Sequence, residues 1–349
     1  MQPIRTALCS FGMSGKIFHA PFIHRNPHYQ LCAVWERSKK IAADLYPGII
    51  SYDNYEAILA DPDIDLVVVN TPNITHFDYT KRALLAGKHV VVEKPFTVTV
   101  AEAIELEELA VKQDRILSVY QNRRFDSDIR TVRRVIEEGS LGQIVEAEIH
   151  YDRYNLVLSP KPHKEIAVQG TGVLYDLGPH VIDQALVLFG MPDALFADIT
   201  HQRPGSQVDD YFEIIFFYPQ LRVRLKSGYV VMEPVPAYAI HGTSGSFLKP
   251  RADPQEIKLN AGLLPEDDTW GVEDPASAGL LHTNIDGQPK KLMIRSEAGN
   301  YGAFYEGLYD AIQNNIFEDK FVPASAGTNV IRIIEAAYKS RDEKRIIAL

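Results

Sequence analysis

Residues 4–15 read IRTALCSFGMSG. An apolar run that suits a buried strand, Arg5–Ser10, leads directly into a turn that contains Gly12 and Gly15. The turn approximates the fingerprint G-x-G-x-x-G, whose glycines let the backbone approach a pyrophosphate at a helix N-terminus. Ser10 stands where the first glycine is expected. Because the turn follows the first strand and opens the first β–α–β unit, the pattern favours dinucleotide binding over a turn without a ligand.

Short apolar runs alternate with helical patterns as far as residue 122. The expected strands are Arg5–Ser10, Gln30–Val34, Leu66–Asn70, His89–Glu93 and Ile116–Tyr120, and the expected helices are Lys39–Leu45, Tyr55–Ala60, His76–Ala86 and Ala101–Gln113. Continuous apolar runs such as Leu66–Val69 are typical of strands that helices cover on both faces. We therefore predict a doubly wound, parallel α/β domain over residues 1–122.

The period of the apolar residues changes after Gly142. Within Val145–Asp152, apolar and polar side chains alternate, which is typical of an antiparallel strand with one wet face. Further strands are expected at Tyr211–Phe217, Leu221–Ser227, Tyr238–Ile240 and Ser246–Leu248. Residues 250–300 are expected to be rich in loops, because prolines recur along them, and Thr328–Arg341 has the spacing of a final helix. The pattern predicts a second α/β domain, residues 123–349, with a mainly antiparallel sheet.

The composition excludes several classes of protein. The chain has 349 residues, of which 46% are hydrophobic, and its formal net charge is −10. An acidic chain without a basic stripe is a poor partner for nucleic acid. The apolar runs are too short to cross a membrane, and the start of the sequence lacks a signal-peptide pattern. The only two cysteines, Cys9 and Cys32, form neither a disulfide framework nor a metal cluster. We expect a cytoplasmic protein that needs no metal.

The residues at the end of the second expected strand suit two different cofactors, NAD and NADP. Glu36 stands where an acidic side chain would hold the ribose of NAD. Arg37, Ser38, Lys39 and Lys40 follow at once and could instead bind the 2′-phosphate of NADP. The residues alone leave the preference open.

Two further segments carry residue types suited to catalysis. Lys94 follows the fourth expected strand and is aimed at the crevice where open α/β sheets bind ligands; the alternative is an ordinary surface lysine. Asp176, His180 and Asp183 recur at helical spacing within Gly170–Gly190. A carboxylate one turn from a histidine suits acid–base chemistry, although a capped core histidine or a solvated face would give the same pattern. Pro179 should kink this helix or mark its start.

In this order, the motifs resemble the Gfo/Idh/MocA oxidoreductases, the family of glucose-fructose oxidoreductase and inositol dehydrogenase. The segments that carry the resemblance, over essentially the whole chain, are Gly12-x-x-Gly15, Thr71-Pro72, Glu93-Lys94-Pro95 and Asp176-Leu177-Gly178-Pro179-His180-x-x-Asp183. Residues 120–125 and 268–271 more narrowly resemble a bacterial scyllo-inositol dehydrogenase subgroup. The segment 161–164 departs from the family, because it lacks the Arg-Trp pair that relatives often carry.

The resemblance implies an N-terminal Rossmann domain and a C-terminal α/β domain whose open sheet often builds dimers or tetramers. It places Lys94, Asp176 and His180 around the substrate hydroxyl. It assigns the cofactor contacts to Gly12, Met13, Ser14, Gly15, Glu36, Arg37, Thr71, Pro72, Asn73, His76, Glu93 and Lys94. We therefore expect a homo-oligomeric NAD(P)-dependent dehydrogenase of a polyol, inositol or sugar, with a slight preference for NADP. The alternative is a sensor that binds NAD(P) without turnover.

Overall fold

The computed structural model describes residues 2–36, 40–159, 165–267, 269–318 and 320–349. The chain divides into two compact units. The first consists of residues 1–122, 255–267 and 301–331, and the second of residues 123–254, 268–300 and 332–349. Each unit is described by itself.

The first unit begins with alternating strands and helices. Its strands are β1 (Ile4–Leu8), β2 (Tyr29–Trp35), β3 (Ile50–Tyr52), β4 (Leu66–Val69), β5 (His89–Glu93) and β6 (Leu117–Tyr120). Its helices up to residue 122 are η1 (Gly15–His19), α1 (Ala20–Arg25), α2 (Ala42–Leu45), α3 (Tyr55–Ala60), η2 (Asn73–Thr75), α4 (His76–Leu85) and α5 (Val100–Lys112), where η marks a π- or 3-10 helix.

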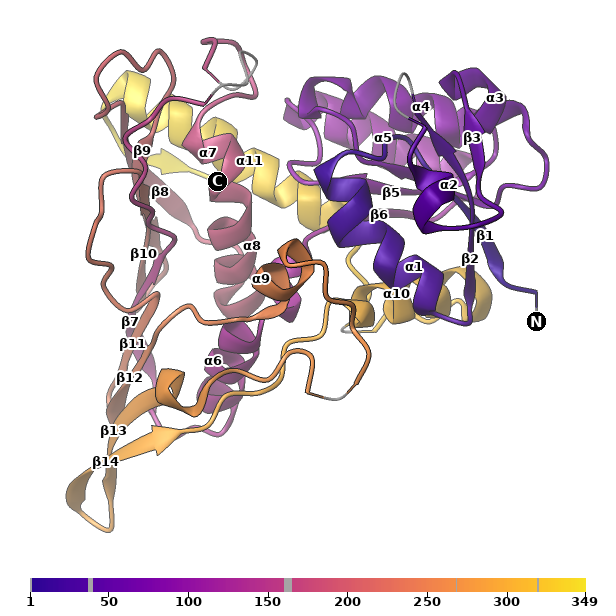
Figure 1. The fold of residues 1–349 in the computed structure, drawn as a ribbon. Coiled ribbons are helices and arrows are strands. Elements are labelled where there is room, and N and C mark those ends of the chain that lie inside the picture. Colours follow the sequence, from indigo (N-terminus) through magenta and orange to yellow (C-terminus); the bar gives the residue numbers. More distant parts are fainter. Residues whose placement is uncertain (1, 37–39, 160–164, 268, 319) are drawn as a thin grey trace. The chain divides into compact units, whose positions relative to one another are not determined.

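Within the described residues, the six strands form one parallel sheet in the order β3-β2-β1-β4-β5-β6. Helices lie on both of its faces (Figure 1), with α1 against β2 and α4 against β4 and β5. The buried side chains of Leu66–Val69 lie at the centre of this core. The strand order reverses between β1 and β4, and such sheets bind ligands at the carboxyl ends of the strands beside this switch point.

Local sequence signals fix the helix ends in the first unit. Asn54 caps α3 by accepting a hydrogen bond from the Ala57 N–H at 2.8 Å. Thr99 and Glu102 form the capping box that begins α5. Gly87, with a φ of +74°, follows α4 in the left-handed conformation that ends many helices.

Later parts of the chain return to the first unit and complete it. They contribute α9 (Gln255–Asn260), α10 (Gly302–Tyr309), η6 (Asp310–Asn314) and the start of α11 (Ala324–Glu343). The Val119 N–H in β6 donates to the Val322 carbonyl at 3.4 Å. A Cβ atom on Gly327 would lie 2.7 Å from the Val119 side chain, so glycine allows α11 to approach this strand.

The second unit is built around one large sheet. Its strands are β7 (Ile144–His150), β8 (Ala194–Thr200), β9 (Tyr211–Phe217), β10 (Arg222–Gly228), β11 (Tyr238–Gly242), β12 (Gly245–Lys249), β13 (Gly279–Ile285), β14 (Gln288–Ile294) and β15 (Ile347–Ala348). Its helices are α6 (Ser127–Glu137), α7 (Val173–Asp176), α8 (Gly178–Phe189), η5 (Pro275–Ser277) and the later part of α11, while η3 (Asn122–Phe125) joins the two units along the chain.

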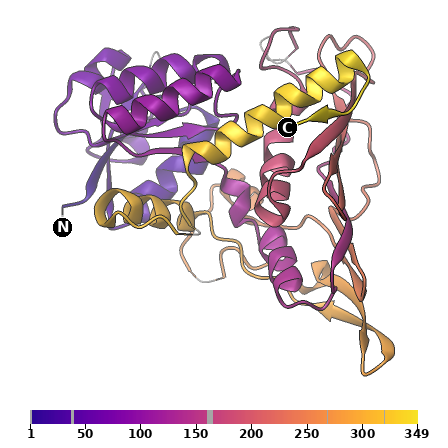
Figure 2. The same cartoon turned by 180° about the vertical axis from the view of Figure 1, so that it is seen from behind.

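Among the described residues, the nine strands follow the order β14-β13-β12-β11-β7-β10-β9-β8-β15. Only the β7–β10 pair is parallel. Helices α6, α7 and α8 lie along one face (Figure 1), and the later part of α11 lies beside β8 and β15 (Figure 2). The predicted combination of a doubly wound parallel sheet and a mainly antiparallel sheet is confirmed.

The prediction missed some elements. Within the loop-rich residues 250–300, β13 and β14 form an antiparallel hairpin. The side chains of β14 are mostly exposed, so this edge strand lacks the apolar alternation that identifies a half-buried strand. Strands β3 and β8 were also missing from the prediction.

Candidate active site

The turn between β1 and η1 closes tightly around Gly15. A Cβ atom on Gly15 would lie 2.2 Å from the Ser10 carbonyl oxygen and 2.7 Å from Asn70 Nδ2, so only glycine fits. Asn70 donates to the same carbonyl at 2.8 Å, and the Gly12 N–H donates to Ser10 Oγ at 3.2 Å. The serine that replaces the first glycine of the fingerprint therefore stabilises the turn. Met13, at its tip, is 61% exposed.

Two buried amides at the carboxyl ends of strands fit a bound dinucleotide. Asn70 follows β4 and Gln121 follows β6, and both residues are buried. Within the described residues, Asn70 Oδ1 and both polar atoms of the Gln121 side chain have no hydrogen-bond partner. Such an atom costs about 1–3 kcal/mol. A ligand with polar edges at these strand ends would complete the missing hydrogen bonds, so the site fits a nicotinamide dinucleotide.

Glu36 lies at the end of β2, as predicted, but its carboxylate faces its own loop. One oxygen, Oε1, accepts hydrogen bonds from the Ile41 N–H at 2.9 Å and the Ala42 N–H at 3.2 Å, and Oε2 accepts from Ser51 Oγ at 2.7 Å. The residue is 5% exposed. This carboxylate therefore caps α2. Arg37, together with Ser38 and Lys39, lies outside the described residues.

His76 joins the segment after β4 to the segment after β5. Its Nδ1 lies 2.8 Å from the Pro95 carbonyl oxygen, and its Nε2 lies 2.9 Å from the Thr71 carbonyl oxygen. Burial lowers the pKa of His76, against the opposing effect of these two carbonyls. The Thr71 hydroxyl contacts Thr75 Oγ1 at 2.7 Å, while Pro72 is exposed. His76 thus holds the backbone of two loops at the strand ends.

Glu93 and Lys94 lie together at the end of β5. The Lys94 side chain is half-buried, and its peptide bond to Pro95 is cis. Burial opposes the charged form of Glu93, but hydrogen bonds and charge from His19, a hydrogen bond from Ser14 and the charge of Lys94 together hold its pKa below the usual range. Glu93 is therefore an anion at neutral pH, directly before the lysine that the sequence singled out.

Asp176 and His180 belong to the second unit, on two successive helices. Asp176 ends α7, and α8 begins again at Gly178 with Pro179 in its first turn, so the proline marks a helix start. Asp176 is half-buried, and the Tyr229 hydroxyl lies 3.5 Å from its carboxylate. His180 is 6% exposed. An acidic group and a buried imidazole thus lie one turn apart.

The third polar residue of this segment, Asp183, has a different environment. Arg124 donates two hydrogen bonds to its carboxylate, at 2.7 Å from Nε and 2.6 Å from Nη2. Burial raises the pKa of Asp183, although Arg124 opposes the shift. The pair anchors α8 to the segment before α6 and is structural.

The sequence did not identify Tyr151, which follows β7. Its ring centroid lies 6.1 Å from that of His180. Three guanidinium groups surround the same ring, with the carbons of Arg251, Arg123 and Arg153 at 4.3, 5.2 and 5.3 Å. The alternation of β7 predicted a core residue at Tyr151, and no spacing rule connects it with Arg123 and Arg251, which are 28 and 100 residues away.

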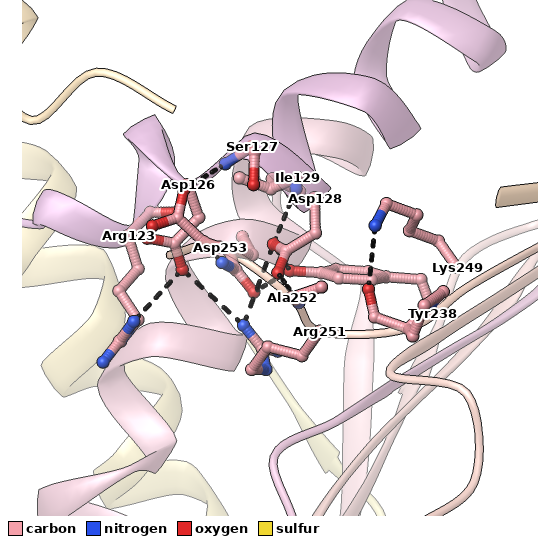
Figure 3. Close-up of polar contacts among 12 residues, drawn as sticks. Arg123, Asp126, Ser127, Asp128, Ile129, Tyr238, Lys249, Arg251, Ala252 and Asp253 are labelled. Atoms are coloured by element: carbon pink, nitrogen blue, oxygen red, sulfur yellow. Dashed lines mark hydrogen bonds and ion pairs between the residues drawn. The ribbon is translucent and has the colours of Figure 1, made fainter. Parts of the chain in front are cut away.

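Two of these arginines belong to a buried charge network at the start of α6. Arg123 and Arg251 lie 3.3 and 3.8 Å from the Asp126 carboxylate, and Arg251 is 4.0 Å from Asp128. Tyr238 donates to Asp128 at 3.0 Å. Figure 3 shows both guanidinium groups turned toward the acidic residues. The network holds the arginines against Tyr151.

In the parts of the chain that the structure describes, no group of three or more His, Cys, Asp or Glu residues is arranged to hold a metal ion. None of the described helices combines the length and apolar character needed to span a bilayer.

Known proteins resemble the chain along its whole length. Residues 4–121 match the family described as "Oxidoreductase family, NAD-binding Rossmann fold", and residues 133–349 match "Oxidoreductase family, C-terminal alpha/beta domain". The scyllo-inositol 2-dehydrogenase (NADP(+)) IolW of Bacillus subtilis is 40% identical over 353 residues, covering 100% of this chain and 97% of IolW.

Solved structures show the same relation. An oxidoreductase from Bacteroides fragilis is 45% identical and superposes with a TM-score of 0.91, covering 100% of both chains. The oxidoreductase yvaA from Bacillus subtilis is 38% identical with a TM-score of 0.95, covering 100% of this chain and 99% of yvaA. The resemblance inferred from the motifs is confirmed. The chain belongs to the Gfo/Idh/MocA family of oxidoreductases, with an NAD-binding Rossmann domain.

Proposed function

We propose that the protein is an NAD(P)-dependent dehydrogenase that oxidises a hydroxyl group of an inositol, another polyol or a sugar. The observation that carries this proposal is the glycine-dependent turn after β1, which lies beside the unpartnered buried amide oxygen of Asn70. The sequence similarity between this chain and IolW, which is named as a scyllo-inositol 2-dehydrogenase, supports inositols as the substrate class.

The proposal assigns the chemistry to Lys94 of the first unit and to Asp176 and His180 of the second. His180 acts as the base that takes the hydroxyl proton. Lys94 donates a hydrogen bond to the same oxygen and stabilises the negative charge that develops there. Asp176 keeps a negative charge near the imidazole and favours its protonated form. Bound nicotinamide supplies the hydride acceptor, and Gly12, Ser14, Asn70 and Gln121 would hold the dinucleotide.

We further propose that NADP is preferred over NAD. A free carboxylate at the end of the second strand would accept hydrogen bonds from the ribose of NAD and repel a 2′-phosphate. Glu36 instead accepts hydrogen bonds from Ile41, Ala42 and Ser51. The carboxylate is therefore occupied within the protein, and IolW is named as an NADP(+) enzyme.

The alternative function is a sensor that binds the dinucleotide without turnover. Nothing would then maintain a lysine, a carboxylate and a buried histidine of the kind that hydride transfer from an alcohol requires. Lys94, Asp176 and His180 are all present, and this favours the enzyme.

The test is a panel of inositols, other polyols and sugars, each offered with NAD and with NADP, in which the absorbance of the reduced nicotinamide is followed. We expect turnover with at least one inositol and a higher kcat/KM with NADP. Tight binding of the dinucleotide without reduction across the whole panel would support the sensor instead.

A further inference from the structure

Glu93 receives hydrogen bonds from both ends of η1 and from the backbone N–H of the next residue, Lys94. Its side chain is 14% exposed, and that of His19 is fully buried. Oε1 of Glu93 lies 3.0 Å from His19 Nε2 and also accepts a hydrogen bond from Ser14 Oγ. Its other oxygen, Oε2, accepts from the Lys94 N–H at 3.1 Å. One carboxylate therefore joins the turn after β1 to the lysine at the end of β5.

The His19 ring is itself fixed from several sides. Its Nδ1 lies 2.7 Å from the Tyr305 hydroxyl, and its ring centroid is 4.3 Å from that of Tyr120. The Tyr29 hydroxyl donates to the Tyr305 backbone carbonyl at 2.7 Å, which fixes this part of α10. His19 is thus held by an element that is remote in sequence and buried in the same unit.

The protonation of the three groups follows from their chemistry. Burial raises the pKa of Tyr305 well above its ordinary value, so the phenol keeps its proton. Glu93 is an anion and can only accept hydrogen bonds. The Nε2 atom of His19 must therefore carry the hydrogen that points at Glu93. The Nδ1 atom shares its hydrogen bond with the Tyr305 hydroxyl, so both ring nitrogens of His19 have a partner.

A carboxylate in this position has consequences at both ends of the dinucleotide site. If Glu93 moves, Ser14 loses an acceptor in the turn that is expected to bind the pyrophosphate. The same movement releases the backbone N–H of Lys94, the residue expected to meet the reacting oxygen. An error of about 1 Å in the placement of a reacting group can cost ~10²-fold in rate.

We propose that His19 and Tyr305 are positioning residues, which hold Glu93 so that binding of the dinucleotide at the turn fixes the place of Lys94. The inference rests on the proposed function, because it gives Lys94 a catalytic role. It goes beyond that function in assigning a task to His19 and Tyr305, which lie outside the cofactor and substrate residues named above.

The experiment compares His19→Leu with His19→Gln, which keeps a donor near the position of Nε2. His24→Leu, an exposed histidine in α1, is the matched control. The dissociation constant of NADPH is measured by fluorescence without any substrate. We expect His19→Leu to weaken binding and to lower kcat, each by about tenfold, the scale of one hydrogen bond to a charged group. His19→Gln should recover most of both losses, and Tyr305→Phe should give a smaller loss of each.

Two further readouts separate positioning from general damage. In a Ser14→Ala background, His19→Leu should weaken NADPH binding by less than it does alone, since both changes act through Glu93. The rate at which a reagent acetylates Lys94, measured by mass spectrometry, should respond to NADPH in the wild type and respond less in His19→Leu. Both readouts are independent of turnover, so they remain decisive if no polyol in the panel is oxidised.

The inference is overturned if His19→Leu leaves NADPH binding and Lys94 acetylation unchanged. It is also overturned if His19→Gln is as impaired as His19→Leu, or if the effects of Ser14→Ala and His19→Leu on binding simply add. Those results would give His19 a role in packing alone. Unfolding by circular dichroism identifies a variant that fails to fold, and Tyr305→Phe then provides the test.

Discussion

Glu93 in the first unit and Asp126 in the second are both largely buried carboxyl groups with cationic neighbours, yet their pKa values shift in opposite directions. For Glu93, hydrogen bonds and charge from its neighbours outweigh burial, and the pKa falls. For Asp126, burial is dominant and the charges of Asp253 and Asp128 add to it, so that the pKa rises well above its ordinary value despite Arg123 and Arg251.

The arrangement of donors, together with burial, decides whether each of these two carboxyl groups is charged. Glu93 is one anion that accepts hydrogen bonds from His19, Ser14 and Lys94. The network around Asp126 contains more acids than cations: Arg123 and Arg251 lie against Asp126, Arg251 also lies near Asp128, and the negative charge of Asp253 adds to that of Asp128 (Figure 3). In that network the charged form of Asp126 is disfavoured. The first arrangement maintains a charge beside the proposed chemistry, and the second avoids one in the core.

The largest effects on kcat are expected at Lys94 and His180, the two residues proposed to meet the reacting oxygen. Lys94→Ala, beside Glu93, and His180→Ala, in the second unit, should each lower kcat by at least ~10²-fold, the scale of losing one acid–base or oxyanion group. The dissociation constant of NADPH should change little. Lys112→Ala and His282→Ala, at exposed positions in the same units, are the controls. Full turnover in either Lys94→Ala or His180→Ala would remove that residue from the mechanism.

Glu93→Gln should lower the free energy of unfolding at pH 7 by about 1–3 kcal/mol, because an amide cannot accept from all three donors. A carboxylate whose pKa is lower in the folded than in the unfolded protein stabilises the fold at pH values above the unfolded pKa. This stabilisation is lost as the pH falls through the lower, folded-state pKa. The difference from the wild type should therefore shrink at acid pH.

Denaturant unfolding between pH 3 and pH 8 measures this effect, with Glu105→Gln, an exposed salt-bridge residue, as the control. A Glu93→Gln variant that is as stable as the wild type at pH 7 would contradict the charge assigned to Glu93. So would a loss of stability that grows as the pH falls.

Asp126→Asn should change the free energy of unfolding in the opposite direction from Glu93→Gln, and by a smaller amount. A raised pKa in the folded state means that the wild type loses stability as the pH rises from about 4 toward the raised value. Asparagine removes the charge and should stabilise the protein at pH 7 by about 1 kcal/mol, with a gain that vanishes at acid pH. Asp198→Asn, on the exposed side of β8, is the control. A loss of stability at pH 7 that shrinks at acid pH would instead show that Arg123 and Arg251 need the Asp126 anion.

The smallest effect concerns a third buried carboxylate, that of Glu36. In Glu36→Gln, the amide oxygen can still accept from Ile41 and Ala42 while the amide nitrogen donates to Ser51. The ratio of kcat/KM for NADP to that for NAD should therefore change by less than about twofold. A shift toward NADP of tenfold, about 1.4 kcal/mol, would instead mean that this carboxylate repels the 2′-phosphate.

Much of the first unit could be predicted from the sequence, because its signals are local. The apolar run Leu66–Val69 was confirmed as strand β4, and the capping box of Thr99 and Glu102 likewise joins residues close together in the chain. The glycine turn was recognised for the same reason. Its dependence on Asn70, which closes the turn from the next strand of the sheet, required the structure.

The missing parts depend on distant contacts. His19 and Tyr305 are 286 residues apart in sequence, and no periodicity connects them. At Glu36 the sequence left the ribose contact open, and it gave no sign that the carboxylate accepts hydrogen bonds from the backbone N–H groups of Ile41 and Ala42. Strand β14 is exposed along most of its length, so hydrophobic alternation could not reveal it.

The central claim is that hydride leaves a carbon of a polyol for a nicotinamide on this protein. The most direct measurement uses scyllo-inositol that carries deuterium on every ring carbon, with NADP as the acceptor and mass spectrometry of the reduced cofactor as the readout. We predict that one deuterium appears in the reduced nicotinamide, and that substitution of Lys94 or His180 by alanine suppresses its appearance. Reduced cofactor without deuterium, or transfer that proceeds unchanged in both variants, would contradict the proposed reaction.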